Sequence, residues 1–151
     1  MYTRILVPLD GSQAAEKALP HAEALGRCFN AQILLTRVVE PLVVPPIPSF
    51  TTPVFTVSEH PGDAEAAQRY LDEQAQALIQ AGVTVETVLR HGDAADELLD
   101  AITEKHADLV VMTACGHGGI ARLIGGSTAE TVLARIPVPA LVIPPPRRVH
   151  K

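Results

Sequence analysis

Two short glycine clusters contain the residue types that could bind a phosphate group. Residues 116–119 read Gly-His-Gly-Gly after an apolar run, and residues 125–128 read Gly-Gly-Ser-Thr. Glycine has no Cβ, so the backbone can approach a ligand closely. The first N–H groups of a helix point outward without partners and therefore suit an anion. If both clusters face one cleft, they would hold the phosphates of a nucleotide.

Ser127 has the spacing of a capping box with Glu130, three residues later. In such a box the serine side chain accepts a hydrogen bond from the first helical turn, and the glutamate accepts one from the serine N–H. Two interpretations stay open. Ser127 caps its helix and does no more, or the backbone N–H groups of Ser127 and Thr128, with a hydroxyl, also bind phosphate oxygens. Gly126 and the first glycine cluster favour the second interpretation.

His117 lies inside the first glycine cluster, where it could donate a hydrogen bond to a phosphate or simply be exposed. Cys115 beside it fits a small buried residue better than a reactive thiol. The spacing of Gly116, Gly118 and Ala121 matches the dinucleotide fingerprint only superficially. That fingerprint follows the first strand of its unit, whereas this one follows the fourth predicted strand. The chain has no P-loop, because neither Gly-Lys-Ser nor Gly-Lys-Thr occurs.

Further candidates lie where apolar runs end. Asp10 follows the first run and could fix a turn or cap a helix. It could equally bind a ribose hydroxyl or a metal ion held by phosphates. Val38 and Met112, taken singly, are typical core residues. At strand ends beside a cleft they could instead form an apolar slot for a base.

The elements that must position these residues alternate between strand and helix. Apolar runs predict five strands, at 5–9, 33–39, 83–89, 109–112 and 139–143. Helical spacing predicts four helices, one from Ser12 with room for a kink at Pro20, and the others at 62–81, 93–106 and 127–135. This alternation is typical of a single α/β domain, with a five-stranded parallel sheet and helices on both faces.

In such a sheet, ligands bind beyond the carboxyl ends of the strands, where the strand order reverses. Three segments directly follow predicted strands or end them: 10–12, 38–40 and 112–119. We therefore expect these three segments to line one cleft. The strand at 83–89 alternates between apolar and polar residues, so we expect it nearer an edge of the sheet.

Residues 41–61 have a different composition, with six prolines in 21 residues. Proline donates no backbone hydrogen bond and resists regular structure, so this segment is predicted to be a long loop. Long loops in compact domains often cover binding sites. A lid over the cleft and a mobile surface insertion are both consistent with the composition.

The totals exclude several classes of protein. A chain of 151 residues with 47% hydrophobic residues is one folded domain and not a disordered segment. A net charge of −5 argues against general binding of nucleic acid. No apolar run reaches the roughly 18 residues of a membrane span, and no secretory signal is apparent. The two cysteines fit a reducing compartment, so a cytoplasmic location is expected.

Together, these segments resemble the universal stress protein family, and the resemblance covers nearly the whole chain. Residues 5–12 are similar to the first strand and turn of that family, and residues 34–41 are similar to its second strand. Residues 119–127 and 137–143 are similar to its C-terminal signature.

The resemblance extends to the motif of the ATP-binding members. They carry a glycine, two residues, a second glycine, nine residues, and then glycine with serine or threonine. Gly116, followed after nine residues by Gly126 and Ser127, matches this pattern. Thr113 stands at the first glycine position, where its side chain would narrow the loop near the ribose or the phosphates.

The resemblance implies a Rossmann-like domain of the adenine nucleotide alpha hydrolase type at 1–146, with a proline-rich insertion at 41–61 and a basic tail at 147–151. It also implies bound ATP, with or without Mg²⁺, and a homodimer formed through the strand at 139–143. That strand would otherwise be an unpaired apolar edge. The residues that the resemblance places around ATP are Pro8, Leu9, Asp10, Val38, Met112, Thr113, Gly116, His117, Gly118, Gly126, Ser127 and Thr128.

Three hypotheses for the function stay open at this point. The leading one is an ATP-binding protein of the stress response that senses or signals as a dimer, since no general base is evident. The second is slow ATP hydrolysis or phosphate transfer, with Asp10 and a metal ion positioning the reaction. The third is a nucleotide-free dimeric interaction module, in which Thr113 closes the pocket.

Overall fold

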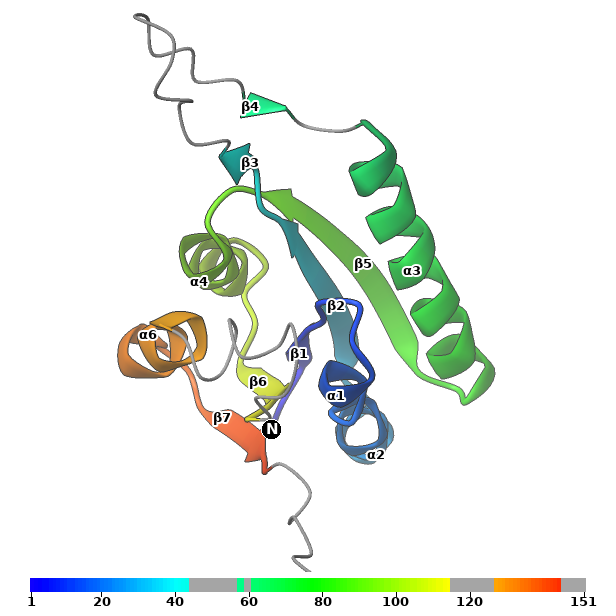
Figure 1. Ribbon diagram of the computed structural model, residues 1–151. Coiled ribbons are helices and arrows are strands. Elements are labelled where there is room, and N and C mark those ends of the chain that lie inside the picture. The colour runs from blue at the N-terminus through cyan, green and yellow to red at the C-terminus, as the bar shows by residue number, and fades with distance from the viewer. Residues whose placement is uncertain (44–56, 59–60, 115–126, 145–151) are drawn as a thin grey trace, which may run out of the picture.

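The computed structural model describes residues 1–43, 57–58, 61–114 and 127–144, and its centre is a five-stranded parallel sheet (Figure 1). The strands are β1 (Arg4–Pro8), β2 (Gln32–Val39), β5 (Thr84–His91), β6 (Leu109–Thr113) and β7 (Ala140–Ile143). They lie in the order β5-β2-β1-β6-β7. The strand order therefore reverses at β1, with β2 and β5 on one side and β6 and β7 on the other. The predicted α/β sheet is confirmed, and β5 lies at its edge as expected.

Helices cover both faces of this sheet. They are α1 (Gln13–Glu16), α2 (Leu19–Phe29), α3 (Pro61–Gln80), α4 (Ala94–Glu104) and α6 (Ser127–Arg135). Figure 1 shows α1, α2 and α3 on one side of the sheet and α4 and α6 on the other, in agreement with two separate buried apolar clusters. Within the described residues, no helix is both long enough and apolar enough to cross a membrane.

The central strands are buried on both faces because their side chains alternate between the two clusters. Ile5 and Val7 of β1 pack beneath α1, α2 and α3, whereas Leu6 packs beneath α4 and α6. All three side chains are fully buried, and Leu34 of β2 is buried beside Leu6. Burial on both faces explains why the sequence shows unbroken apolar runs here and not alternation.

Local signals set the helix starts. Ser12 Oγ accepts a hydrogen bond from the N–H of Ala15 at 3.2 Å and caps α1. Asp93 Oδ1 accepts one from the N–H of Asp96 at 3.1 Å and caps α4. The single helical pattern that begins at Ser12 is divided into α1 and α2. Pro20 lies in the first turn of α2, where a missing N–H loses no helical hydrogen bond.

The proline-rich segment differs from the predicted loop at both of its ends. Two short strands, β3 (Leu42–Val43) and β4 (Val57–Ser58), form an antiparallel pair. Helix α3 already begins at Pro61, because proline is well tolerated in the first turn of a helix. Residues 44–56 and 59–60 lie outside the described part of the chain, so the expectation of a lid stays a prediction.

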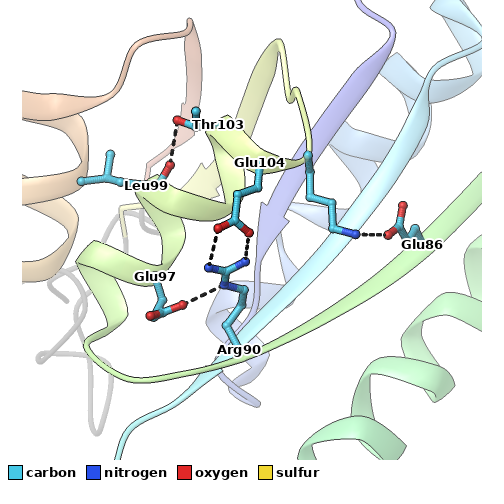
Figure 2. A network of polar contacts seen from close by, with 7 residues as sticks. Glu86, Arg90, Glu97, Leu99, Thr103 and Glu104 are labelled. Atoms are coloured by element: carbon cyan, nitrogen blue, oxygen red, sulfur yellow. Dashed lines mark hydrogen bonds and ion pairs between the residues drawn. The ribbon is translucent and has the colours of Figure 1, made fainter.

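A polar network joins the edge strand β5 to both ends of α4 (Figure 2). Arg90 Nε lies 2.8 Å from Glu97 Oε2, and its Nη1 donates to Glu104. Lys105 Nζ lies 2.6 Å from Glu86 Oε1. The hydrogen bond from Arg90 and its charge hold the pKa of the exposed Glu104 carboxyl below its usual value. Because these ion pairs link β5 to α4, they stabilise the position of α4 on the sheet.

Candidate functional site

The ends of β1, β2 and β6 meet at one edge of the sheet, with β1 in the middle. Leu6 of β1 lies level with Leu34 of β2 and Val110 of β6, so the three strands reach the same edge. β1 ends at Pro8, while β2 continues to Val39 beside β5. The strand order reverses between β1 and β6, which is the position at which doubly wound sheets bind their ligands.

Asp10 fixes the turn that leaves β1. Its Oδ1 accepts a hydrogen bond from the N–H of Ser12 at 2.9 Å and another from Ser12 Oγ. Gly11 between them has φ +87°, a conformation that favours glycine. The turn-forming role of Asp10 is therefore present in the structure. Asp10 Oδ2 accepts no hydrogen bond from the described residues and remains able to accept one from a ligand.

Arg37 lies against this turn and Tyr70 contacts Arg37, and the sequence analysis missed both residues. A Cβ built on Gly11 would stand 3.2 Å from Arg37 Nη1. Arg37 Cζ lies 5.2 Å from the centre of the Tyr70 ring, in a cation–π contact. One signal in the sequence was available: Arg37 is the single charged residue of β2.

The Tyr70 hydroxyl is buried beside the Glu16 carboxylate. Burial raises the pKa of this phenol above its ordinary value, and the nearby Glu16 and Asp10 carboxylates raise it further. The charge of Arg37 acts in the opposite direction. The Tyr70 phenol is therefore neutral throughout the physiological range, and Arg37 carries the positive charge of this region.

Val38 and Met112 share the face of the sheet that α4 and α6 cover. Met112 belongs to the buried cluster beneath these helices, and Val38 packs against it while partly exposed. They come from β2 and β6, on either side of the end of β1. Two side chains on one face could form an apolar slot for a base. The same placement is also typical of two ordinary core residues.

The remaining predicted residues at the strand ends point elsewhere. Leu9 is buried in the cluster beneath α1, α2 and α3, and its N–H donates to the carbonyl of Thr36 at 2.8 Å. Only the Leu9 carbonyl is therefore left for a ligand. Thr113 is buried at the end of β6, where strand alternation turns its side chain away from the face of Met112. Pro8 is partly buried as the last residue of β1.

Glu40, which we expected at the cleft, contacts a helix instead. Its Oε1 accepts a hydrogen bond from the N–H of Ala94 at 3.3 Å, next to the cap that Asp93 provides. Two carboxylates thus occupy the N-terminus of α4. A ligand phosphate would be repelled there, so α4 offers no anion site at this edge of the sheet.

Helix α6 begins at Ser127, as predicted. β6 and β7 are parallel, so α6 must carry the chain back across the sheet, and its N-terminus lies toward the carboxyl edge. Ala129 and Val132 pack α6 against the same cluster as Met112. The candidates that lie outside the described residues are Gly116, His117, Gly118, Gly126 and the side chains of Ser127 and Thr128.

In the part of the chain that the structure describes, no three histidine, cysteine, aspartate or glutamate side chains lie close enough to hold a metal ion.

The fold and this edge define an α/β protein of the doubly wound class with a candidate nucleotide site. Residues 1–144 match the model of the universal stress protein family, and the chain belongs to this family. It is 28% identical to a universal stress protein of Methanocaldococcus jannaschii, over 98% of this chain and 85% of that protein. Its fold is similar to that of the universal stress protein UspA from Lactobacillus plantarum, with a TM-score of 0.71 and 25% identity over 94% of this chain and 97% of that one.

Two similar structures contain adenine nucleotides. One is a universal stress protein in complex with cAMP, with a TM-score of 0.69 and 22% identity over 94% of this chain and 96% of that one. The other is the universal stress protein from Archaeoglobus fulgidus in complex with dAMP, with a TM-score of 0.68 and 20% identity over 94% and 98%. At these identities, the likeness establishes the shared fold.

Proposed function

We propose that this protein binds ATP at the carboxyl edge of its sheet and acts as a nucleotide-dependent sensor or signalling dimer in the stress response. The observation that carries the proposal is the position of α6. This helix begins directly after a glycine pair, and its N-terminus lies toward the carboxyl edge of the sheet, where β1 and β6 end. The nucleotide complexes of two structures with the same fold support an adenine nucleotide as the ligand.

In this proposal, different residues bind the base, the ribose and the phosphates of ATP. Val38 and Met112 hold the base on the face of α4 and α6, and Asp10 Oδ2 accepts a hydrogen bond from the ribose. Pro8 and the Leu9 carbonyl lie beside Asp10, and Thr113 narrows the approach from β6. The residues proposed for the phosphates are Gly116, His117, Gly118, Gly126, Ser127 and Thr128.

A homodimer through β7 completes the proposal. β7 is the last strand on its side of the sheet, so one of its edges is unpaired within the described chain. Leu141 on this strand is 38% exposed, which is unusual for a leucine in the middle of a strand. A second copy related by a two-fold axis would pair with this edge and bury Leu141 in both copies.

Equilibrium titration of the purified chain with ATP and Mg²⁺ tests the binding proposal. We expect saturable binding that Ser127→Ala weakens and Gly126→Val weakens more, because valine blocks the close approach of the backbone. Mass spectrometry of the denatured protein would show co-purified nucleotide. An absence of saturable binding at millimolar ATP would reject the proposal in favour of a nucleotide-free module.

A turnover assay on the same preparation separates binding from slow hydrolysis. Asn can form the same turn as Asp10, so Asp10→Asn removes the carboxylate charge and preserves the backbone. Turnover that disappears in this variant would assign Asp10 a role in hydrolysis. Binding without turnover would leave the sensor hypothesis as the simpler one.

A further inference from the structure

Arg37 is a partly buried charge that the described structure leaves without a polar partner. Five ion pairs occur among the described residues, and none of them includes Arg37. Its contacts are the face of the Tyr70 ring and the backbone at Gly11. A cation–π contact forms no hydrogen bond through the guanidinium N–H groups, so these donors stay available to an anion.

The Tyr70 hydroxyl next to Arg37 already has an acceptor close by. It is buried beside the Glu16 carboxylate, whose hydrogen bond contributes to its raised pKa, and Tyr70 carries the ring over which the Arg37 guanidinium lies. Glu16 therefore faces Tyr70, and the donors of Arg37 still lack an acceptor among the described residues beside the turn at Gly11.

The nearby carboxylates do not pair with Arg37. Asp10 Oδ1 is engaged by Ser12, and Glu16 Oε1 accepts a hydrogen bond from Gln74 Nε2 at 2.9 Å. Neither carboxylate forms an ion pair with Arg37 among the described contacts. The two carboxylates attract the Arg37 guanidinium, but its N–H groups remain available to another acceptor.

The geometry relates Arg37 to one part of the ligand. Under the proposed function, the base lies on the face of α4 and α6, and α6 holds the 5′-phosphates on that same face. Arg37 follows the alternation of Ile33 and Leu35 onto the opposite face, with Tyr70 of α3, and its guanidinium lies against Gly11, next to Asp10. Because Asp10 is proposed to accept a hydrogen bond from the ribose, the ribose edge with its 2′- and 3′-hydroxyls would be the part of the nucleotide nearest to Arg37.

We propose that Arg37 is a specificity-determining residue that favours adenine nucleotides with a phosphate on the ribose edge. The inference rests on the proposed function, because it assumes that the base and the 5′-phosphate bind where that function places them. Asp10 accepts a hydrogen bond from the free ribose hydroxyl, and Arg37 pairs with the phosphate on its neighbour. Guanidinium binds phosphate through two parallel hydrogen bonds, which a lysine ammonium cannot reproduce.

Calorimetric titration of the full chain with three probes tests this inference. The probes are AMP, adenosine 3′,5′-bisphosphate and adenosine 2′,5′-bisphosphate, which differ only in the phosphate on the ribose. We expect one bisphosphate to bind about tenfold more tightly than AMP, as a charge-assisted hydrogen bond would give. Arg37→Gln should remove this preference and leave AMP binding in place, whereas Arg37→Lys should keep part of it.

Arg27→Gln is the matched control, because it removes the same charge from an exposed arginine of α2. It should leave the preference unchanged. Equal binding of AMP and both bisphosphates to the wild type overturns the inference but not the proposed function. A preference that survives in Arg37→Gln overturns it as well. If neither AMP nor ATP binds the wild type, both proposals fail. If Arg37→Gln does not fold, the wild-type comparison and Arg37→Lys still decide.

Discussion

Gly11 and Gly82 form a natural pair of sites for testing the contact between the β1 turn and Arg37. Gly11 has φ +87° and Gly82 has φ +90°, so alanine meets the same backbone strain at both positions. A Cβ on Gly82 would have no heavy atom within 4 Å. A Cβ on Gly11 would stand 3.2 Å from Arg37 Nη1 and 3.3 Å from Nη2. The two substitutions therefore differ in this one contact.

The strain sets the expected loss of stability. A left-handed conformation costs a residue with a Cβ about 1–2 kcal/mol, and alanine recovers about 0.4–1 kcal/mol by restricting the unfolded chain. We expect Gly11→Ala and Gly82→Ala each to lower the free energy of unfolding by about 1 kcal/mol. In a domain of this size, that corresponds to a decrease in Tm of about 2–4 °C. The end of the Arg37 side chain is flexible, so its displacement adds little to the cost at Gly11.

Nucleotide binding should separate the two variants. Gly11→Ala displaces the guanidinium and should reduce the preference for a phosphorylated ribose, whereas Gly82→Ala should keep it. Chemical denaturation measures the stabilities, and the titration with AMP and the bisphosphates measures the preference. The reasoning is refuted if Gly82→Ala reduces the preference equally. It is also refuted if Gly11→Ala is destabilised by more than about 3 kcal/mol, since Arg37 would then be held rigidly and not by a flexible contact.

Three further predictions concern the core, the pH dependence and the dimer. Leu34→Ala should lower the free energy of unfolding by about 3 kcal/mol in chemical denaturation, because Leu34 is fully buried between the sheet and α4. Burial raises the pKa of Asp108, but hydrogen bonds from Thr3 and Arg4 outweigh this effect and hold it below its usual value. Asp108 thus adds stability that is complete above its unfolded pKa of about 3.9 and is lost as the pH falls through its lower folded pKa. Asp108→Asn should flatten the acid side of a stability–pH curve, and a curve as steep as that of the wild type would contradict this account. Leu141→Lys should convert the proposed dimer to a monomer in light scattering, while Ile79→Lys on the exposed side of α3 should not.

The sequence predicted most elements because their signals are local. Ser12 and Asp93 cap helices at starts that the sequence predicted, and α6 begins at Ser127, the first residue of the predicted helix. The unbroken apolar runs predicted buried parallel strands, which the alternation of Ile5 and Leu6 between two clusters explains. Boundaries were less predictable. The single helix predicted from Ser12 divides into α1 and α2, with Pro20 in the first turn of α2, and α3 begins at Pro61, inside the predicted loop.

The candidate site depended more strongly on tertiary contacts. Asp10 was a candidate from its place after β1, yet only the fold shows that Oδ1 is engaged by Ser12 and that Oδ2 is left open among the described contacts. Glu40 seemed equivalent to Asp10 by position, but it binds the N-terminus of α4, more than 50 residues away along the chain. Arg37 was overlooked because its neighbours, Gly11 and Tyr70, come from different parts of the sequence.

The sequence by itself determined which segments become strands and helices, and that glycines precede a helix start, since periodicity, capping and backbone freedom act over a few residues. Only the tertiary structure decided the strand order, the face to which each strand-end side chain points, and the cation–π contact between Arg37 and Tyr70. These features arise from packing between segments that are distant in the chain, and no local pattern encodes which of those segments become neighbours.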